Sequence, residues 1–169
     1  MIAFVNASPL IFLSKLGNIH LLDVLYDKII TTKEVIAEVT RENKGIHQEI
    51  LRNYIKSSLH VDHTFDDEFA NNLLEVTNIH RGEATLTALA RHYKNEPIIL
   101  ILDDKGARKV AKTLGIKVTG TIGIILRLVH QGHFSKSQGK DYIDSLVKDH
   151  GLRMSTSTYI KILQEIEQL

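Results

Sequence analysis

The chain alternates short, unbroken apolar runs with longer segments in which apolar residues recur every three or four positions. Short runs without polar alternation are typical of strands buried on both faces, and the longer spacing is typical of amphipathic helices. Because the two patterns succeed each other along the chain, they predict an α/β fold with a parallel sheet. The predicted strands are Ile2–Val5, Lys28–Thr31, Leu59–Asp62, Ile98–Leu102 and Ile116–Val118.

Helix boundaries are marked by capping and stop residues. Ser8 followed by Pro9 predicts a helix that begins with Ser8 as its N-cap, and Gly17 predicts its end. Thr31 and Glu34 have the spacing of a capping box at the start of another helix. Further helices are expected over 19–25, 45–56, 122–129, 136–148 and 155–169, near 69, from 81 and after 104.

Composition narrows the class of protein. The chain has 169 residues, a formal net charge of +1 and no cysteine. Its length suits one domain, and its balanced charge predicts no whole-molecule attraction to nucleic acid. The lack of cysteine excludes disulfides and thiolate sites and is typical of the reducing cytoplasm. No apolar run approaches a membrane span, and we expect no signal peptide.

Oxygen-bearing side chains gather where predicted strands end and helices begin. Asp103 and Asp104 follow the fourth strand, Asn6 follows the first, and Glu38 and Glu83 lie on helices. In a parallel sheet these positions converge on the rim where α/β proteins bind ligands. Adjacent carboxylates repel and need a cation, and oxygen ligands suit Mg²⁺ or Mn²⁺. Such a metal activates water and offsets charge on a phosphodiester.

Each of these residues also has a purely structural interpretation. Glu83 is a first-turn acid favoured by the helix dipole, and Glu38 is a solvated helix acid. Asn6 suits an Asx-turn, and one of the paired aspartates suits the N-cap of the next helix. Two other acids, Glu34 and Glu42, are expected to be cap and surface residues.

Four motifs together resemble the PIN domain superfamily, in particular its VapC-like and predicted nucleic-acid-binding members with an Asn-Ala-Ser-Pro-Leu start. The resemblance covers about residues 1–132, which we expect to be the PIN-like nuclease domain, with 133–169 as a helical extension of the same domain. The motifs are Asn6–Ile11, Gly82–Ala84, Leu102–Arg108 and Gly120–Gly123.

The resemblance implies a three-layer α/β/α fold with parallel strand order 3-2-1-4-5. It implies a Mg²⁺- or Mn²⁺-dependent ribonuclease, often the toxin of a toxin–antitoxin pair and often a homodimer. The implied catalytic residues are Glu38, Glu83 and Asp104, and the implied metal ligands are Asn6, Glu83, Asp103 and Asp104. Most PIN nucleases have an aspartate at the position of Asn6, so this chain carries one negative charge fewer there.

Contacts to RNA are predicted from groups near these motifs. Lys105 and Arg108 follow the acid pair on one helix, and Ser8 and Thr121 lie at predicted helix starts. These groups are suited to bind phosphates, although a solvated surface or an N-cap explains each of them equally well.

Three functional hypotheses remain open at this point. The first is a metal-dependent endoribonuclease with RNA as substrate and an antitoxin protein as partner. The second is a PIN domain that no longer cuts and instead binds RNA or protein, because Asn6 replaces a carboxylate. The third, which leaves Glu38 and Glu83 without a role, is a receiver-like domain that forms an aspartyl phosphate.

Overall fold

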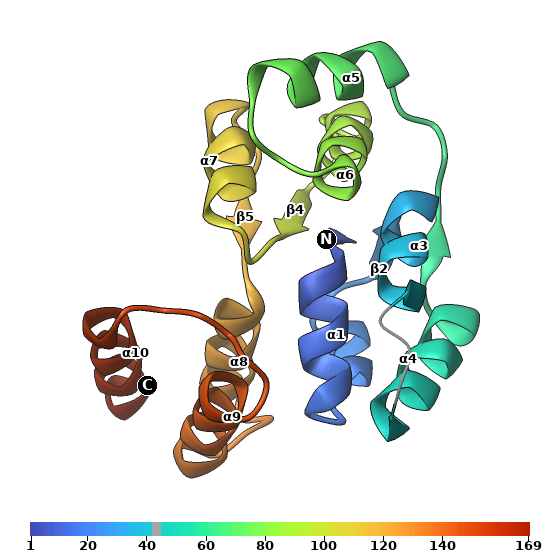
Figure 1. Ribbon diagram of the computed structural model, residues 1–169. Coiled ribbons are helices and arrows are strands. Elements are labelled where there is room, and N and C mark those ends of the chain that lie inside the picture. The colour runs from blue at the N-terminus through green and yellow to red at the C-terminus, as the bar shows by residue number, and fades with distance from the viewer. Residues whose placement is uncertain (42–44) are drawn as a thin grey trace. The chain divides into compact units, whose positions relative to one another are not determined.

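The computed structural model of the chain describes residues 1–41 and 45–169, so Glu42 lies outside the described residues. Five parallel strands form one sheet in the order β3-β2-β1-β4-β5 (Figure 1). The strands are β1 (Ile2–Val5), β2 (Lys28–Thr31), β3 (His60–Val61), β4 (Ile98–Ile101) and β5 (Val118–Thr119). The predicted α/β class and strand order are therefore confirmed.

Helices connect these strands in the first part of the chain. A 3₁₀ turn, Ile19–Leu21, precedes the short α2. The α-helices up to β5 are α1 (Ala7–Lys15), α2 (Leu22–Leu25), α3 (Lys33–Arg41), α4 (Ile46–Ser57), α5 (Asp67–Val76), α6 (Arg81–His92) and α7 (Lys105–Thr113). Each crossover between parallel strands thus contains helix, as the alternating sequence pattern predicts.

The last strand begins later than the sequence indicates. Ile116 is not in β5, because its N–H donates to the carbonyl oxygen of Ala111 at 3.0 Å and closes the end of α7. Gly115, with φ +75°, permits this turn. The strand therefore starts at Val118, which pairs with Leu100 of β4.

Two helix starts also differ from the prediction. The N-cap of α1 is Asn6 and not Ser8, so Pro9 is the third helical residue, where its missing N–H costs no helical hydrogen bond. The N-cap of α3 is Thr32 and not Thr31, because the N–H of Val35 donates to Thr32 Oγ1 at 3.4 Å. The Thr31 hydroxyl instead donates to the carbonyl oxygen of the last β1 residue at 2.8 Å.

The described chain forms two compact units, Met1–Gly120 and Thr121–Leu169. The second unit contains α8 (Thr121–His130), α9 (Lys136–Lys148) and α10 (Thr156–Gln168), with α9 packed against both of the others. No helix among the described residues is long and apolar enough to cross a membrane. The division of the chain at residue 132 stays a prediction.

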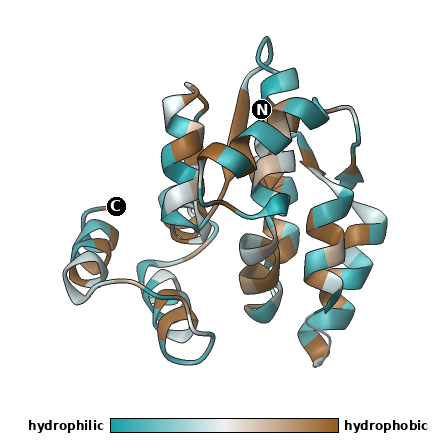
Figure 2. Ribbon diagram, turned by 45° about the horizontal axis from the view of Figure 1, so that its top comes forward, coloured by the Kyte–Doolittle hydropathy of each residue, from teal (hydrophilic) through white to brown (hydrophobic). Residues whose placement is uncertain are grey.

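The central strand is buried on both faces. Ala3, Phe4 and Val5 are each 0% exposed, and successive strand residues point to opposite faces of a sheet. In Figure 2 brown, the hydrophobic colour, covers much of the strand ribbons, whereas the helices alternate between hydrophobic and hydrophilic residues. Burial of this kind makes the strand positions rigid, so the polar residues that follow them are held in fixed places.

One polar contact joins the edge of the sheet to the end of α6. The Tyr93 hydroxyl donates to Asp62 Oδ2 at 2.6 Å, and the Tyr93 ring packs edge-on against Phe4. Although burial alone would raise the pKa of Asp62, hydrogen bonds from Tyr93 and Thr64 hold this pKa well below its usual value of 3.8. The same contact raises the pKa of Tyr93 to about 12.

We expect Tyr93→Phe to lower the free energy of unfolding by about 1 kcal/mol at neutral pH, because one hydrogen bond to a carboxylate is lost and the ring remains. A carboxyl with a depressed folded pKa contributes stability above its unfolded pKa and loses it as pH falls. The difference between the two proteins should therefore shrink below pH 3.8. Urea unfolding at several pH values measures this, and a constant difference across the range would contradict it.

Candidate metal centre

The candidate site is built around the first turn of α6. The backbone N–H of His80, the N-cap of this helix, donates to Glu83 Oε2 at 2.9 Å. Glu83 is 5% exposed, and the hydrogen bond fixes one of its two carboxylate oxygens. The predicted interpretation of Glu83 as a first-turn acid is therefore correct, and it leaves the second oxygen for another partner.

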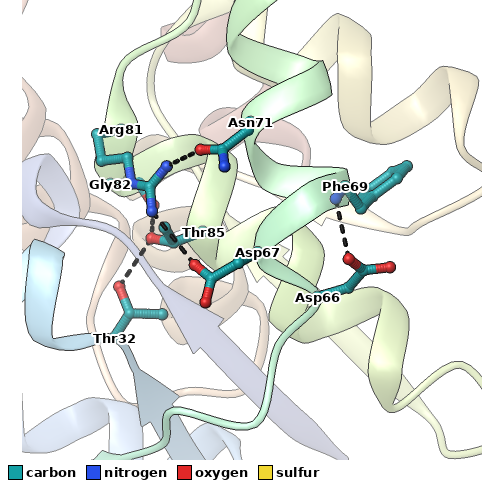
Figure 3. Close-up of polar contacts among 8 residues, drawn as sticks. All are labelled: Thr32, Asp66, Asp67, Phe69, Asn71, Arg81, Gly82 and Thr85. Atoms are coloured by element: carbon teal, nitrogen blue, oxygen red, sulfur yellow. Dashed lines mark hydrogen bonds and ion pairs between the residues drawn. The ribbon is translucent and has the colours of Figure 1, made fainter.

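Contacts on both sides hold this turn in place, as Figure 3 shows. The Arg81 guanidinium donates to Asn71 Oδ1 and, at 3.3 Å, to Asp67 Oδ1, both on α5. The hydroxyls of Thr85 and Thr32 lie 3.1 Å apart and are fully buried, which ties α6 to the start of α3. The turn is thereby anchored to two neighbouring helices.

Asn6 and Glu38 converge on the backbone of Gly82. A Cβ at position 82 would lie 3.1 Å from Glu38 Oε2 and 3.6 Å from Asn6 Oδ1. Asn6 is 4% exposed, and its Oδ1 has no hydrogen-bond partner within the described part of the chain. Leaving a buried carbonyl oxygen without a partner costs about 1–3 kcal/mol, so this atom is suited to bind a cation or another donor.

Glu83 is electrostatically coupled to two further acids. Burial raises the pKa of its carboxyl, the His80 N–H opposes this, and the negative charges of Asp104 and Glu38 raise the pKa further. The net direction is upward, so ionised Glu83 is destabilised where it lies. A bound cation would reverse this, because it would favour the ionised form of all three carboxylates.

The two adjacent aspartates have different surroundings. Asp104 is the N-cap of α7, with Oδ1 accepting the N–H of Ala107 at 2.8 Å, so the prediction that one of the pair caps this helix is correct. Asp103 instead turns to Gly120, where a Cβ would lie 2.8 Å from Asp103 Oδ1 and 2.8 Å from Arg108 Nη1. Asp103 is therefore beside a guanidinium, whereas Asp104 is the member of the pair whose charge acts on Glu83.

The donor set fits a hard divalent cation. It offers carboxylate and amide oxygens, one of them a buried oxygen that has no partner among residues 1–41 and 45–169, and a glycine that leaves space beside two of them. Within the described residues, however, no group of three or more histidine, cysteine, aspartate or glutamate side chains is arranged to hold a metal ion. The ligand set Asn6, Glu83, Asp103 and Asp104 stays a prediction.

The predicted RNA contacts are distributed over the fold. Ser8 is half-buried in the first turn of α1, and Lys105 is exposed at the first position of α7. Arg108 lies with Asp103 over Gly120. Thr121 begins the second unit and is buried. Among these four, the structure therefore brings Arg108 close to one of the acids of the predicted site.

The fold and the arrangement of acids can be compared with known families. The family model DUF3368, described as a PIN domain, matches residues 2–168. The chain belongs to the PIN domain family. PIN domains are generally nucleases and typically use divalent metals, and membership removes the receiver-like alternative. The match extends beyond residue 132, where the resemblance in sequence motifs ends. No curated protein matches the chain.

Sequence reasoning missed the role of Gly82 in this PIN domain. A glycine in a helix costs about 1 kcal/mol relative to alanine, so its place between Arg81 and Glu83 is a signal of close approach. That signal does not say which side chains approach. The side chains that approach Gly82 are those of Glu38 and Asn6, and the packing of α3 against α6 brings Glu38 there.

We expect Gly82→Ala to weaken Mn²⁺ binding roughly tenfold, because the new methyl group displaces the Glu38 carboxylate from its place beside Asn6. The free energy of unfolding should stay the same or rise by up to about 1 kcal/mol, since alanine is the better helix former. Titration calorimetry and thermal unfolding separate the two effects. In a Glu38→Ala background the substitution should no longer alter Mn²⁺ affinity; an equal loss there would rule out this cause.

Proposed function

We propose that the chain is a Mg²⁺- or Mn²⁺-dependent endoribonuclease that acts as the toxin of a toxin–antitoxin pair. The observation that carries the proposal is the buried Oδ1 of Asn6, which has no hydrogen-bond partner among the residues that the structure describes. It lies near Glu38 at Gly82, and the neighbouring Glu83 carries a charge on which Asp104 acts. Asn6 and Asp104 are the N-caps of α1 and α7, and Glu38 and Glu83 lie on α3 and α6, so the proposed centre draws its oxygen atoms from four parts of the fold. An RNA substrate, an antitoxin partner and a homodimeric assembly are parts of this proposal.

In this proposal the residues divide the work of phosphodiester hydrolysis. Asn6, Glu83 and Asp104 hold the metal, and Asp103 supports them beside Arg108. The metal, when bound, lowers the pKa of water and neutralises charge on the phosphate. Glu38 orients the attacking water through a hydrogen bond, and the exposed Lys105 and the half-buried Arg108 position the phosphate group.

The carboxylate of Asp104 can be tested without disturbing its helix. Asparagine is as good an N-cap as aspartate, so Asp104→Asn should leave the free energy of unfolding within about 0.5 kcal/mol of the parent. We expect it to lower Mn²⁺-dependent cleavage of RNA by roughly 100-fold or more, since even outer-shell partners of a metal typically contribute 10–100-fold. Cleavage is measured on labelled RNA with Mn²⁺, with Mg²⁺ and with a chelator.

A matched control is available on α5. Asp66 caps that helix in the same way, with Oδ1 accepting the N–H of Phe69 at 2.9 Å. Asp66→Asn should therefore retain full cleavage. Full activity of Asp104→Asn, or cleavage that persists in chelator, would refute the metal-dependent mechanism. In cells, the parent chain should arrest growth when it is induced, and Asp104→Asn should not.

A second candidate function follows from Asn6. An amide supplies one neutral oxygen where a carboxylate would supply charge, and metal affinity depends on the charge of the ligands. A PIN domain weakened in this way would serve as a module that binds RNA or protein. It would bind these partners equally well with and without a divalent metal.

Asn6→Asp distinguishes the two functions. We expect it to bind Mn²⁺ roughly tenfold more tightly, because it adds a negative ligand beside Glu38. If the parent chain is a nuclease, both proteins cleave and the variant needs less metal. The exposed Asn53 on α4 provides a control, since Asn53→Asp adds the same charge elsewhere. Absence of cleavage by the parent chain over many RNAs, together with metal-independent RNA binding, would favour the binding module.

A further inference from the structure

An open groove lies between the end of α5 and one face of α7, within the first unit. Both helices pack against α6, and the groove between them has a volume of about 420 Å³. Residues from α7 line it at the spacing of a single helix face. The lining residues include Leu73, Ile79, Lys109, Val110, Thr113 and Leu114.

The groove is apolar and continuous with the core. Leu73 and Ile79 belong to the core of buried residues, and Val110 packs against it. Leu114, which lines the groove, is 38% exposed, so part of the apolar lining is open to solvent. Apolar lining that is open to solvent is suited to bind a partner.

Positive charge borders one side of the groove. Lys109 is among the lining residues, and Lys105 and Lys112 lie four residues before it and three after it, so they share its side of α7. All three lysines are exposed, and none has an ion-pair partner within the described part of the chain. None of the described residues that line the groove is acidic.

We propose that this groove binds an acidic amphipathic helix of a partner protein. The apolar side of that helix fills the space above Ile79 and Val110, and its acidic residues lie along Lys105, Lys109 and Lys112. An exposed helix face with ridges three and four residues apart packs well against a second helix. The phosphates of an RNA strand would pair with the lysines but would leave the apolar lining exposed to water. An amphipathic helix would cover both, so it fits the groove better.

The proposal is tested with two synthetic peptides about 15 residues long, because shorter isolated helices are only marginally stable. Both carry leucines at the spacing i, i+4, i+7, and they differ in having glutamate or lysine on the flank beside the leucines. We expect the glutamate peptide to bind at least about tenfold more tightly than the lysine peptide, measured by fluorescence anisotropy at moderate salt. Binding is measured without RNA or metal, so the result does not depend on the proposed nuclease function.

Two variants locate the peptide. Lys109→Glu should weaken the glutamate peptide at least about tenfold and favour the lysine peptide. Lys56→Glu, on the exposed face of α4, is the matched charge control and should change neither affinity. Thr113→Arg should abolish binding of both peptides, because the longer side chain fills the groove while the core beneath stays intact.

The control for Thr113→Arg is Thr40→Arg. Each of these exposed threonines has its hydroxyl donating to the carbonyl oxygen four residues earlier, Thr113 to Lys109 at 3.0 Å and Thr40 to Ile36 at 2.9 Å. Thermal unfolding of all four variants should match that of the parent chain. Thr40→Arg should leave peptide binding unchanged, whereas loss of binding in it would show that the added arginine acts non-specifically.

Four other outcomes would overturn the proposal. The first is equal binding of the two peptides, and the second is binding that survives Thr113→Arg. The third is a self-associated chain that Thr113→Arg dissociates, because the occupant would then be a second copy. The fourth is that neither peptide binds while a short single-stranded RNA binds and loses affinity in Lys109→Glu, because the lysines would then form an RNA surface.

Discussion

Burial of the Glu83 carboxyl at the end of the sheet, with two further carboxylates acting on it, is the main electrostatic constraint on this PIN domain. Glu83 is held in a buried position by the His80 N–H, and the charges of Asp104 and Glu38 make that position less favourable. The fold tolerates this because the last two residues of each of the central strands β1, β2 and β4 are buried and α6 is anchored to α3 and α5. The stability of the surrounding packed structure thus offsets the energetic cost of a polar site that would be unstable by itself.

The sequence predicts the sheet well because burial of strands leaves a strong pattern. Ile2–Val5 and Lys28–Thr31 were predicted with their observed boundaries, and the strand order follows the family resemblance. The start of α3, which the sequence predicts one residue too early, is decided by competition for hydrogen bonds. Thr31 and Thr32 are both suitable N-caps, and the pairing of Thr31 with the end of β1 leaves Thr32 for α3.

The candidate site was predictable to a different extent for each residue. Asp104 stands out because two acids follow a buried strand, and a capping role was already among its interpretations. The difference between Asp103 and Asp104 could not be predicted, because it depends on Gly120, which is remote in sequence. The same holds for Gly82, whose neighbours Glu38, on α3, and Asn6, the N-cap of α1, are remote in sequence. Local spacing identifies residue types, whereas their partners are set by tertiary packing.

Asp104 is both a helix cap and a proposed metal ligand. This double role affects which substitutions can accumulate at position 104 during evolution. Replacing Asp104 with a residue that cannot cap a helix would destabilise α7, so selection for stable folding would act against that change. Replacing Asp104 with asparagine would keep the cap and remove the charge, so selection for stable folding would not act against it. A descendant with asparagine at 104 as well as at 6 would keep the fold and lack the proposed metal ligand, so measurements of stability alone would not detect the loss.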